Sequence, residues 1–194
     1  IFFRTSVMTP SIARTQLTAD YSIPKIINGG WQLATGHAHA HALDMKDAHN
    51  AFAELLDRGF DTFDCADIYT GVEAFYGQII AERRRAGLSL PQIHTKFVPD
   101  LKDLAHVDRA YVERVIERSL SRLGVERLDM VQFHWWDYNV PGCVEVALDL
   151  LKLKEKGKIR NIGVTNFDAP HLKEIVDVGV PIVSCQSQYS LFDR

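Results

Sequence analysis

The sequence has few cysteines and no pattern that pairs them. Cys65, Cys143 and Cys185 are the only three in 194 residues, and no two of them have C-x-x-C spacing. A disulfide framework would use an even number, and one thiol would be left over here. The cysteines are therefore predicted to be free thiols in a reducing compartment.

The sequence also lacks a long apolar run and an excess of basic charge. No stretch approaches the roughly 20 apolar residues that a membrane helix needs. The 22 Lys and Arg against 25 Asp and Glu give a net charge of −3, which favours neither a nucleic-acid nor a membrane partner. With 46% hydrophobic residues, the chain has the composition and length of one soluble domain.

The N-terminal segment contains almost no acidic residues. Residues 1–19 include Arg4, Arg14 and several Ser and Thr, and the first acid is Asp20. This composition resembles an organellar transit peptide, and the alternative is a disordered leader. In either case we expect residues 1–22 to lie outside the domain formed by residues 23–194. A cytoplasmic location is expected unless the segment directs the protein to an organelle.

Short apolar runs alternate with longer amphipathic stretches after residue 22. The runs are Ile23–Ile27, Phe60–Phe63, Gln92–Phe97, Leu128–Phe133, Ile159–Val164 and Ile182–Gln186. Their length and apolar character are typical of buried parallel strands. The alternation with helical segments predicts an α/β fold, in which helices cover a parallel sheet.

The clearest predicted helix spans Asp108–Leu123. Its apolar residues recur at a spacing of three and four, which places them on one face, and Gly124 is a typical C-terminal stop. Asp168 before Ala169–Pro170 is predicted to be the N-cap of another helix. About five helices are expected in all.

Two architectures contain such alternation. A doubly wound sheet usually has a G-x-G-x-x-G turn after its first strand, whereas here Gly29-Gly30-Trp31 follows the first run. A barrel distributes its chemistry over the ends of successive strands, where the polar residues of this chain occur. We therefore predict a (β/α)8 TIM barrel, of which about six βα units are present.

Four side chains at three successive strand ends form a chemically coherent set. Asp64 and Tyr69 follow the second run, Lys96 ends the third and His134 follows the fourth. Reduction of a carbonyl by hydride needs a proton donor, and a tyrosine becomes a better acid beside an ammonium group. An aspartate can hold that lysine charged, and a histidine can orient the substrate oxygen.

Each of these residues has a plainer interpretation when it is taken alone. The aspartate can cap a loop, the tyrosine can be half-buried in the core, the lysine can be solvated, and the histidine beside Trp135 and Trp136 can be packed in the core. Their occurrence on three neighbouring strand ends favours the catalytic interpretation.

Several motifs in the right order make the chain similar to the aldo-keto reductase family. The matching segments are Gly59–Glu73, Thr95–Lys96, Leu128–Trp135, Lys156–Phe167 and Gln186–Leu191. Within the first of them, Asp64 and Tyr69 keep the family's five-residue spacing. The resemblance covers roughly residues 25–194.

The resemblance implies a function and a set of roles. It implies an NAD(P)H-dependent oxidoreductase that reduces a small aldehyde or ketone, or oxidises the corresponding alcohol, with NADP as the expected cofactor and NAD possible. The implied catalytic tetrad is Asp64, Tyr69, Lys96 and His134. The implied cofactor-binding residues are Gly30, Trp31, Thr165, Asn166 and Gln186. The implied substrate pocket contains Trp31 and Trp135, with Trp136 beside them.

Three departures from the family pattern are present. Cys65 replaces a Thr or Ser, and Thr165 replaces a Ser while keeping the hydroxyl. The sequence ends at Arg194, whereas such a barrel typically has about 250 residues. We therefore expect an incomplete barrel that binds the cofactor poorly by itself.

Two other functions are compatible with parts of the sequence. His37, His39 and His41 alternate as in metal-dependent hydrolases of barrel fold, but they lie in a polar loop and no second histidine pair follows. A solvated loop is the preferred interpretation, and no metal site is predicted. The other alternative is a non-catalytic nicotinamide-binding regulatory subunit, which the retained tetrad disfavours.

Overall fold

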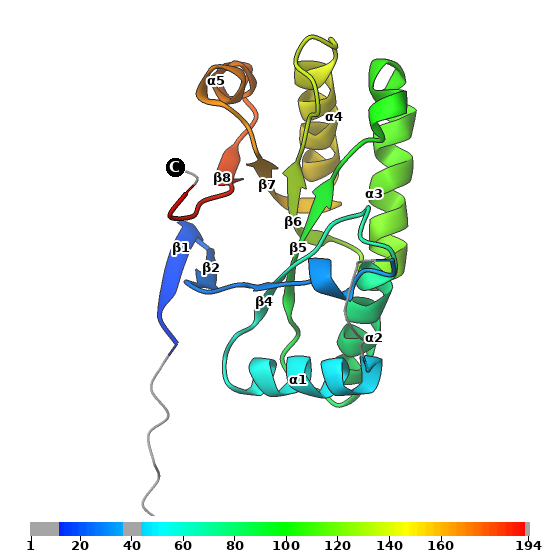
Figure 1. Cartoon of the computed structure of the whole chain (residues 1–194), viewed down its shortest axis with the longest axis vertical. Coiled ribbons are helices and arrows are strands. Elements are labelled where there is room, and N and C mark those ends of the chain that lie inside the picture. The colour runs from blue at the N-terminus through cyan, green and yellow to red at the C-terminus, as the bar shows by residue number, and fades with distance from the viewer. Residues whose placement is uncertain (1–11, 37–43, 193–194) are drawn as a thin grey trace, which may run out of the picture.

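The computed structural model describes residues 12–36 and 44–192. Within these ranges the chain forms a six-stranded parallel sheet, a two-stranded antiparallel hairpin and five α-helices. Figure 1 shows the helices arranged along an arc outside the strands, from α1 through α2, α3 and α4 to α5.

The strands of the central sheet are paired in the order in which they occur in the sequence. They are β3 (Asn28–Gly29), β4 (Thr62–Asp64), β5 (Gln92–Phe97), β6 (Leu128–Phe133), β7 (Ile159–Thr165) and β8 (Ile182–Gln186). All five pairings are parallel. The carboxyl ends of the strands therefore meet along a single edge of the sheet.

Five α-helices connect or follow these strands. They are α1 (Met45–Asp57), α2 (Val72–Arg85), α3 (Arg109–Leu123), α4 (Cys143–Glu155) and α5 (Ala169–Asp177), with short 3-10 segments η1 (Trp31–Leu33) and η2 (Leu101–His106). The predicted N-cap of α5 is confirmed, since Asp168 accepts from the His171 amide at 2.9 Å. Asp108 caps α3 in the same way and accepts from the Tyr111 amide at 2.7 Å. Gly124 ends α3 with a φ of 64°, a conformation that glycine adopts without strain.

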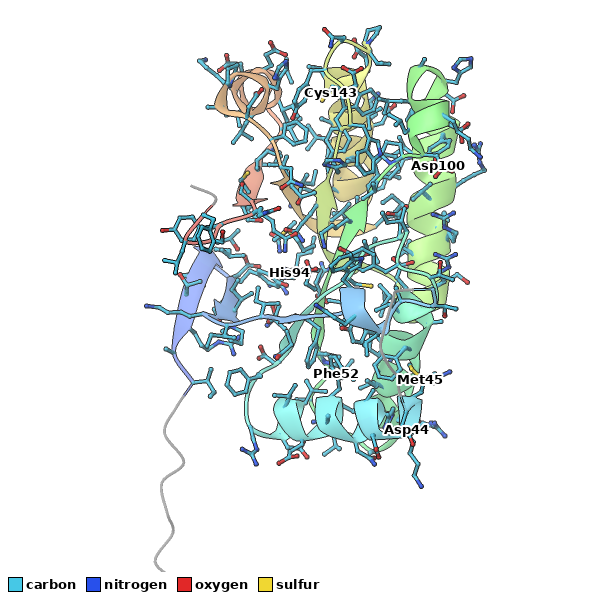
Figure 2. All side chains as sticks on the ribbon, viewed as in Figure 1. Asp44, Met45, Phe52, His94, Asp100 and Cys143 are labelled. Atoms are coloured by element: carbon cyan, nitrogen blue, oxygen red, sulfur yellow. The ribbon has the colours of Figure 1, made fainter. Side chains whose placement is uncertain are left out.

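The side chains of each strand alternate between two environments. Val131 and Phe133 of β6 point outward and are buried against the helices. From α1, Phe52 contacts Phe63 of β4 with ring centres 4.8 Å apart, and Figure 2 shows Phe52 pointing toward the strands. Burial of an aromatic or aliphatic side chain of this size stabilises the fold by about 1.5–3 kcal/mol. The side chains at the alternate positions of β6, which include Met130 and Gln132, face the inner side of the sheet.

For residues 12–22, the structure corrects the prediction that the N-terminal segment lies outside the fold. β1 (Arg14–Thr18) and β2 (Tyr21–Pro24) form an antiparallel hairpin, and residues 1–11 lie outside the described ranges. Tyr21 and Ile23 are buried and share a small apolar cluster with Met130 of the central sheet. Sequence patterns missed the hairpin because contacts with residues more than 70 positions away hold it in place.

A second correction follows from the hairpin. The run Ile23–Ile27 was predicted to be the first strand of the parallel sheet, but Ile23 belongs to the hairpin and the sheet begins at β3. Figure 2 shows His94 between the hairpin and the central strands, where its Nε2 lies 3.0 Å from the Tyr21 hydroxyl. The hairpin therefore covers the inner side of the sheet below the polar residues described next.

Candidate active site

The predicted pair of Asp64 and Lys96 forms the centre of the site. The Lys96 ammonium donates to both carboxylate oxygens, at 2.8 and 2.7 Å, and to the carbonyl oxygen of Cys65 at 2.8 Å. The two side chains are only 14% and 7% exposed. A charge in so buried a place needs a partner, and each of these groups provides one for the other.

The strands dictate this pairing. Asp64 is the last residue of β4, and Lys96 lies near the end of the neighbouring strand β5. On β5, His94 and Lys96 have the inward parity, while Ile93 and Phe97 face the helical core. The sequence therefore places an ammonium and a carboxylate on adjacent strands at the same edge.

Two amides complete the surroundings of the Asp64 carboxylate. The side-chain amides of Gln132 on β6 and Gln186 on β8 both donate to Oδ1, each at 3.1 Å. Gln132 was not predicted to be a site residue. The available signal was a polar side chain at the inward parity of an otherwise apolar strand, and Gln132 is 4% exposed. A buried amide needs a partner, and the carboxylate provides one.

Tyr69 lies in the loop after β4, above this pair. The Lys96 ammonium is 5.1 Å from the centre of its ring. Burial raises the pKa of the Tyr69 phenol to about 12, and the negative charge of Asp64 adds to the shift. The hydroxyl is therefore protonated at neutral pH and is available as a proton donor, while the nearby ammonium favours the phenolate that donation leaves behind.

His134 follows β6 and faces the same space. Its Nδ1 lies 3.1 Å from the backbone oxygen of Thr165, and a carbonyl oxygen only accepts, so we assign the ring proton to Nδ1. In the neutral ring Nε2 is then an acceptor. The Trp136 ring meets the imidazole edge-on, with centres 4.4 Å apart, and restricts its rotation.

These groups surround one cavity of about 390 Å³ at the carboxyl ends of the strands. Tyr69, Lys96 and His134 line it directly, whereas Asp64 does not line it and is hydrogen-bonded to Lys96. The other lining residues are Ile68, Val98, Trp136, Thr165, Asn166, Gln186, Ser187 and Gln188. The structure therefore brings the predicted tetrad together with three of the five predicted cofactor-binding residues.

Those three residues are linked to one another and to the tetrad. The Gln186 backbone oxygen accepts from the Asn166 amide at 2.8 Å and from the Thr165 hydroxyl at 3.2 Å. Asn166 has a φ of 57°, a left-handed conformation that asparagine tolerates better than most residues. Hydroxyl and amide groups on one wall of a cavity suit a planar carboxamide, which both donates and accepts. These residues fit a nicotinamide.

The structure gives the remaining predicted residues other surroundings. Trp135 was predicted in the substrate pocket, but it is 2% exposed, its Nε1 donates to the Val140 oxygen at 3.1 Å, and its ring packs on Phe133. Trp136, the next residue of the loop after β6, lines the cavity instead. Within the described ranges, the lining of this cavity does not include Trp31, which is half-exposed on η1.

Gly30 has a packing reason to be glycine. A Cβ atom there would lie 2.6 Å from the Tyr76 hydroxyl and 2.9 Å from the Asp64 backbone oxygen. The Gly30 amide also donates to that oxygen at 2.9 Å. The residue therefore allows the chain after β3 to approach β4 and α2 closely, next to the aspartate of the tetrad.

The described residues bear on the metal alternative and on the expectation that no membrane helix is present. In the part of the chain that the structure describes, no group of three or more His, Cys, Asp or Glu side chains is placed to hold a metal ion. The proposed metal-binding histidines, His37, His39 and His41, lie outside that part. No helix in the described ranges has the length and apolarity needed to cross a membrane.

Six parallel strands with outer helices, and a polar site at their carboxyl ends, define part of a (β/α)8 barrel. The model of the aldo/keto reductase family matches residues 25–194. The chain therefore belongs to the aldo/keto reductase family.

Individual relatives agree with this assignment. The chain is 32% identical to the aldo-keto reductase YhdN of Bacillus subtilis, over 95% of the chain and 54% of YhdN. It is 27% identical to an NADH-specific methylglyoxal reductase of Escherichia coli, over 91% of the chain and 58% of that protein. The crystal structure of the thermostable aldo-keto reductase Tm1743 superposes with a TM-score of 0.75 at 26% identity, over 92% of the chain and 63% of Tm1743. The chain spans about half the length of the curated relatives it matches.

Proposed function

We propose that the protein is an NAD(P)H-dependent oxidoreductase that reduces a small aldehyde or ketone, or oxidises the corresponding alcohol. The observation that carries the proposal is the buried Asp64–Lys96 ion pair beneath Tyr69, in a cavity that Thr165, Asn166 and Gln186 also line. Acid–base groups and carboxamide-binding groups face the same space, as hydride transfer to a carbonyl requires.

Tyr69 is the proposed general acid of reduction. Its hydroxyl gives a proton to the substrate oxygen as negative charge develops there, and in the oxidative direction the phenolate takes the proton back. Lys96 stabilises that phenolate through its positive charge. Asp64 acts through Lys96 and keeps the ammonium charged and in place.

His134 is the proposed orienting residue for the substrate oxygen. With the ring proton on Nδ1, the neutral imidazole accepts a hydrogen bond at Nε2 from an alcohol hydroxyl. The imidazolium form donates at Nε2 instead and binds a carbonyl oxygen.

Thr165, Asn166 and Gln186 are proposed to hold the carboxamide of the nicotinamide. A bound reduced nicotinamide supplies the hydride. The family resemblance favours NADP, whereas the relative in Escherichia coli is named as NADH-specific, so both cofactors belong in the first test.

The proposed substrate is a small carbonyl compound. Ile68, Val98 and Trp136 add apolar surface to the lining of the cavity. The name of the relative in Escherichia coli makes methylglyoxal the first compound to test.

The proposal is tested with Tyr69→Phe in a protein of the relatives' full length. Turnover of methylglyoxal and other small carbonyls with NADPH and NADH should fall at least roughly 100-fold, since general acid catalysis contributes about 10²–10⁴. Cofactor affinity, measured by fluorescence titration, should change less than about twofold.

Tyr138→Phe is the matched control. Tyr138 stacks on His171 and is not among the residues that line the cavity. This variant should keep full turnover. Cofactor binding by the wild type without turnover of any carbonyl would refute the catalytic proposal and favour a nicotinamide-binding regulatory subunit.

A further inference from the structure

Asp67 is a buried carboxylate that the proposed reaction does not use. It lies two residues before Tyr69 and is 4% exposed. Tyr69 and Ala66 close a turn, in which the Tyr69 amide donates to the Ala66 oxygen at 3.0 Å, and Asp67 is the first central residue of that turn. Whatever holds Asp67 therefore also holds the backbone that presents Tyr69.

Four hydrogen bonds fix Asp67 to its neighbours. Its Oδ1 accepts from the Val98 amide and its Oδ2 from the Arg118 guanidinium, both at 3.1 Å. Its backbone oxygen accepts from Arg122 at 3.0 Å, and its amide donates to the Lys96 oxygen at 3.3 Å. The turn is thereby tied to the end of β5 on one side and to α3 on the other.

A second buried carboxylate extends this network. Glu73 in the first turn of α2 accepts from the Thr95 hydroxyl at 2.7 Å and from Arg122 at 3.2 Å. Arg122 therefore bridges Asp67 and Glu73. The two arginines are 45% and 40% exposed, whereas both carboxylates are almost fully buried. The charge pairing lies behind the cavity and leaves the cavity to the tetrad.

We propose that Asp67 is a positioning residue for the reaction, which holds Tyr69 at its distance from Lys96 by bracing the turn between Val98 and Arg118. The inference rests on the proposed function of Tyr69. Tyr69, Ile68 and Val98 all line the cavity, so a loosened brace moves the proton donor and one cavity wall together.

The brace needs a carboxylate rather than an amide. Both oxygens of Asp67 face hydrogen-bond donors, one from Val98 and one from Arg118. In Asp67→Asn the NH2 group must face one of those donors, and that hydrogen bond is lost. A shift of about 1 Å in a catalytic group is sufficient to lower a rate by up to roughly 100-fold.

Charge at Asp67 responds to pH in the neutral range. Burial and, to a smaller extent, the negative charge of Glu73 raise the pKa of Asp67 to about 7, against the opposing effects of the Val98 amide and Arg118. The charged groups that face it are Glu73 of α2 and Arg118 and Arg122 of α3. As pH falls through about 7, the carboxyl group gains a proton and loses one acceptor, so the brace weakens toward acid.

The kinetic test uses Asp67→Asn in a protein of the relatives' full length. At pH 8 we expect kcat to fall roughly 10-fold or more, with the KM values changed less than about twofold. The ratio of wild-type to variant kcat should shrink toward pH 5.5, where wild-type Asp67 is itself protonated. Asp177→Asn makes the same chemical change in an exposed ion pair of α5 and should leave kcat and its pH profile unchanged.

Arg118 gives an independent variant in case Asp67→Asn does not fold. Because Arg118 is partly exposed, Arg118→Met should fold and should lower kcat in the same way, and Arg118→Lys should restore most of the loss by keeping the charge. Equal kcat for wild type, Asp67→Asn and Arg118→Met at pH 8 would overturn the inference.

Hydrogen exchange separates this inference from the proposed function. Exchange of the Val98 and Tyr69 amides should be faster in Asp67→Asn than in the wild type, whether or not the protein turns over a carbonyl. If the wild type is inactive but these amides exchange faster in Asp67→Asn, the proposed function is refuted and the positioning role of Asp67 stands. An active wild type with unchanged exchange in Asp67→Asn would refute the brace alone.

Discussion

Trp135 and Trp136 are adjacent in the sequence but lie on opposite sides of the chain. Trp135 is 2% exposed in the core, whereas Trp136 is 48% exposed, stands edge-on to His134 and donates from Nε1 to the Pro99 oxygen at 2.7 Å. One indole therefore supports the fold, and the other forms a wall of the proposed active site.

The two tryptophans should separate stability from substrate binding. Trp135→Ala leaves a large buried cavity and should lower the free energy of unfolding by about 3–5 kcal/mol, measured by denaturant titration. Trp136→Ala should cost little stability but raise the substrate KM by roughly 2- to 10-fold, through the loss of aromatic contact. The reverse pattern would contradict this placement of the two rings.

Removal of the Lys96 charge should affect both stability and turnover. Lys96→Met leaves the Asp64 carboxylate with only the two glutamine amides, and an unpaired buried charge costs about 3–5 kcal/mol. The double variant Lys96→Met/Asp64→Asn removes that charge and should recover much of the stability, but none of the turnover.

An exposed ion pair provides the comparison for Lys96. Glu54 on α1 and Arg58 just after the helix are each 64% exposed, so Arg58→Met should cost at most about 0.5 kcal/mol. Equal losses for Arg58→Met and Lys96→Met would contradict the burial of the Asp64–Lys96 pair. Recovery of activity in the double variant would contradict its proposed role in catalysis.

Gly30→Ala should destabilise the protein by about 1–3 kcal/mol, because the new Cβ overlaps Tyr76 and the Asp64 backbone oxygen. The neighbouring Gly29 is the control, since the nearest atom to a Cβ there is the end of the Gln32 side chain at 4.0 Å. Thermal unfolding of the two variants measures the difference. A loss of cofactor affinity in Gly30→Ala without a loss of stability would favour a direct cofactor contact instead.

His94 should make the hairpin sensitive to acid. Burial lowers the pKa of His94 to about 4 from 6.5, with a small opposing effect from Asp64. His94 therefore binds a proton below about pH 6.5 in the unfolded chain, but only below about pH 4 in the folded chain. Stability from this group is fully present above pH 6.5 and is lost toward pH 4, by at most roughly 1.4 kcal/mol per pH unit.

The comparison for His94 is His94→Gln, which keeps a polar side chain beside Tyr21 but does not titrate. Denaturant titrations of both proteins between pH 4 and 7.5 measure the slope of stability against pH. The variant should be less stable at pH 7.5 and should lose less stability on acidification. Parallel slopes would mean that His94 does not remain neutral in the folded protein.

Much of the sheet was predictable from local pattern. The runs Gln92–Phe97, Leu128–Phe133 and Ile182–Gln186 coincide with β5, β6 and β8. Turn or charged residues bound these runs, so the pattern marks their ends. The first strand of the sheet has two residues, too few to carry any periodicity, and its position was predicted wrongly.

The candidate site was predictable in its membership but not in its detail. The tetrad follows from residues at consecutive strand ends, because parallel strands bring those ends together. The choice between Trp135 and Trp136 depends on how one loop leaves β6. The roles of Gln132 and Asp67 depend on partners 68 and 31 residues away in the sequence.

The sequence by itself determined the alternation of strands and helices, the barrel class and the residues able to transfer a proton, because these depend on local periodicity and on order along the chain. Only the tertiary structure decided which polar and charged groups form hydrogen bonds and ion pairs with one another. It placed the hairpin under His94, directed Trp136 rather than Trp135 to the cavity, and joined Asp67 to α3. Those contacts link distant residues, and their energies depend on burial, which no local pattern records.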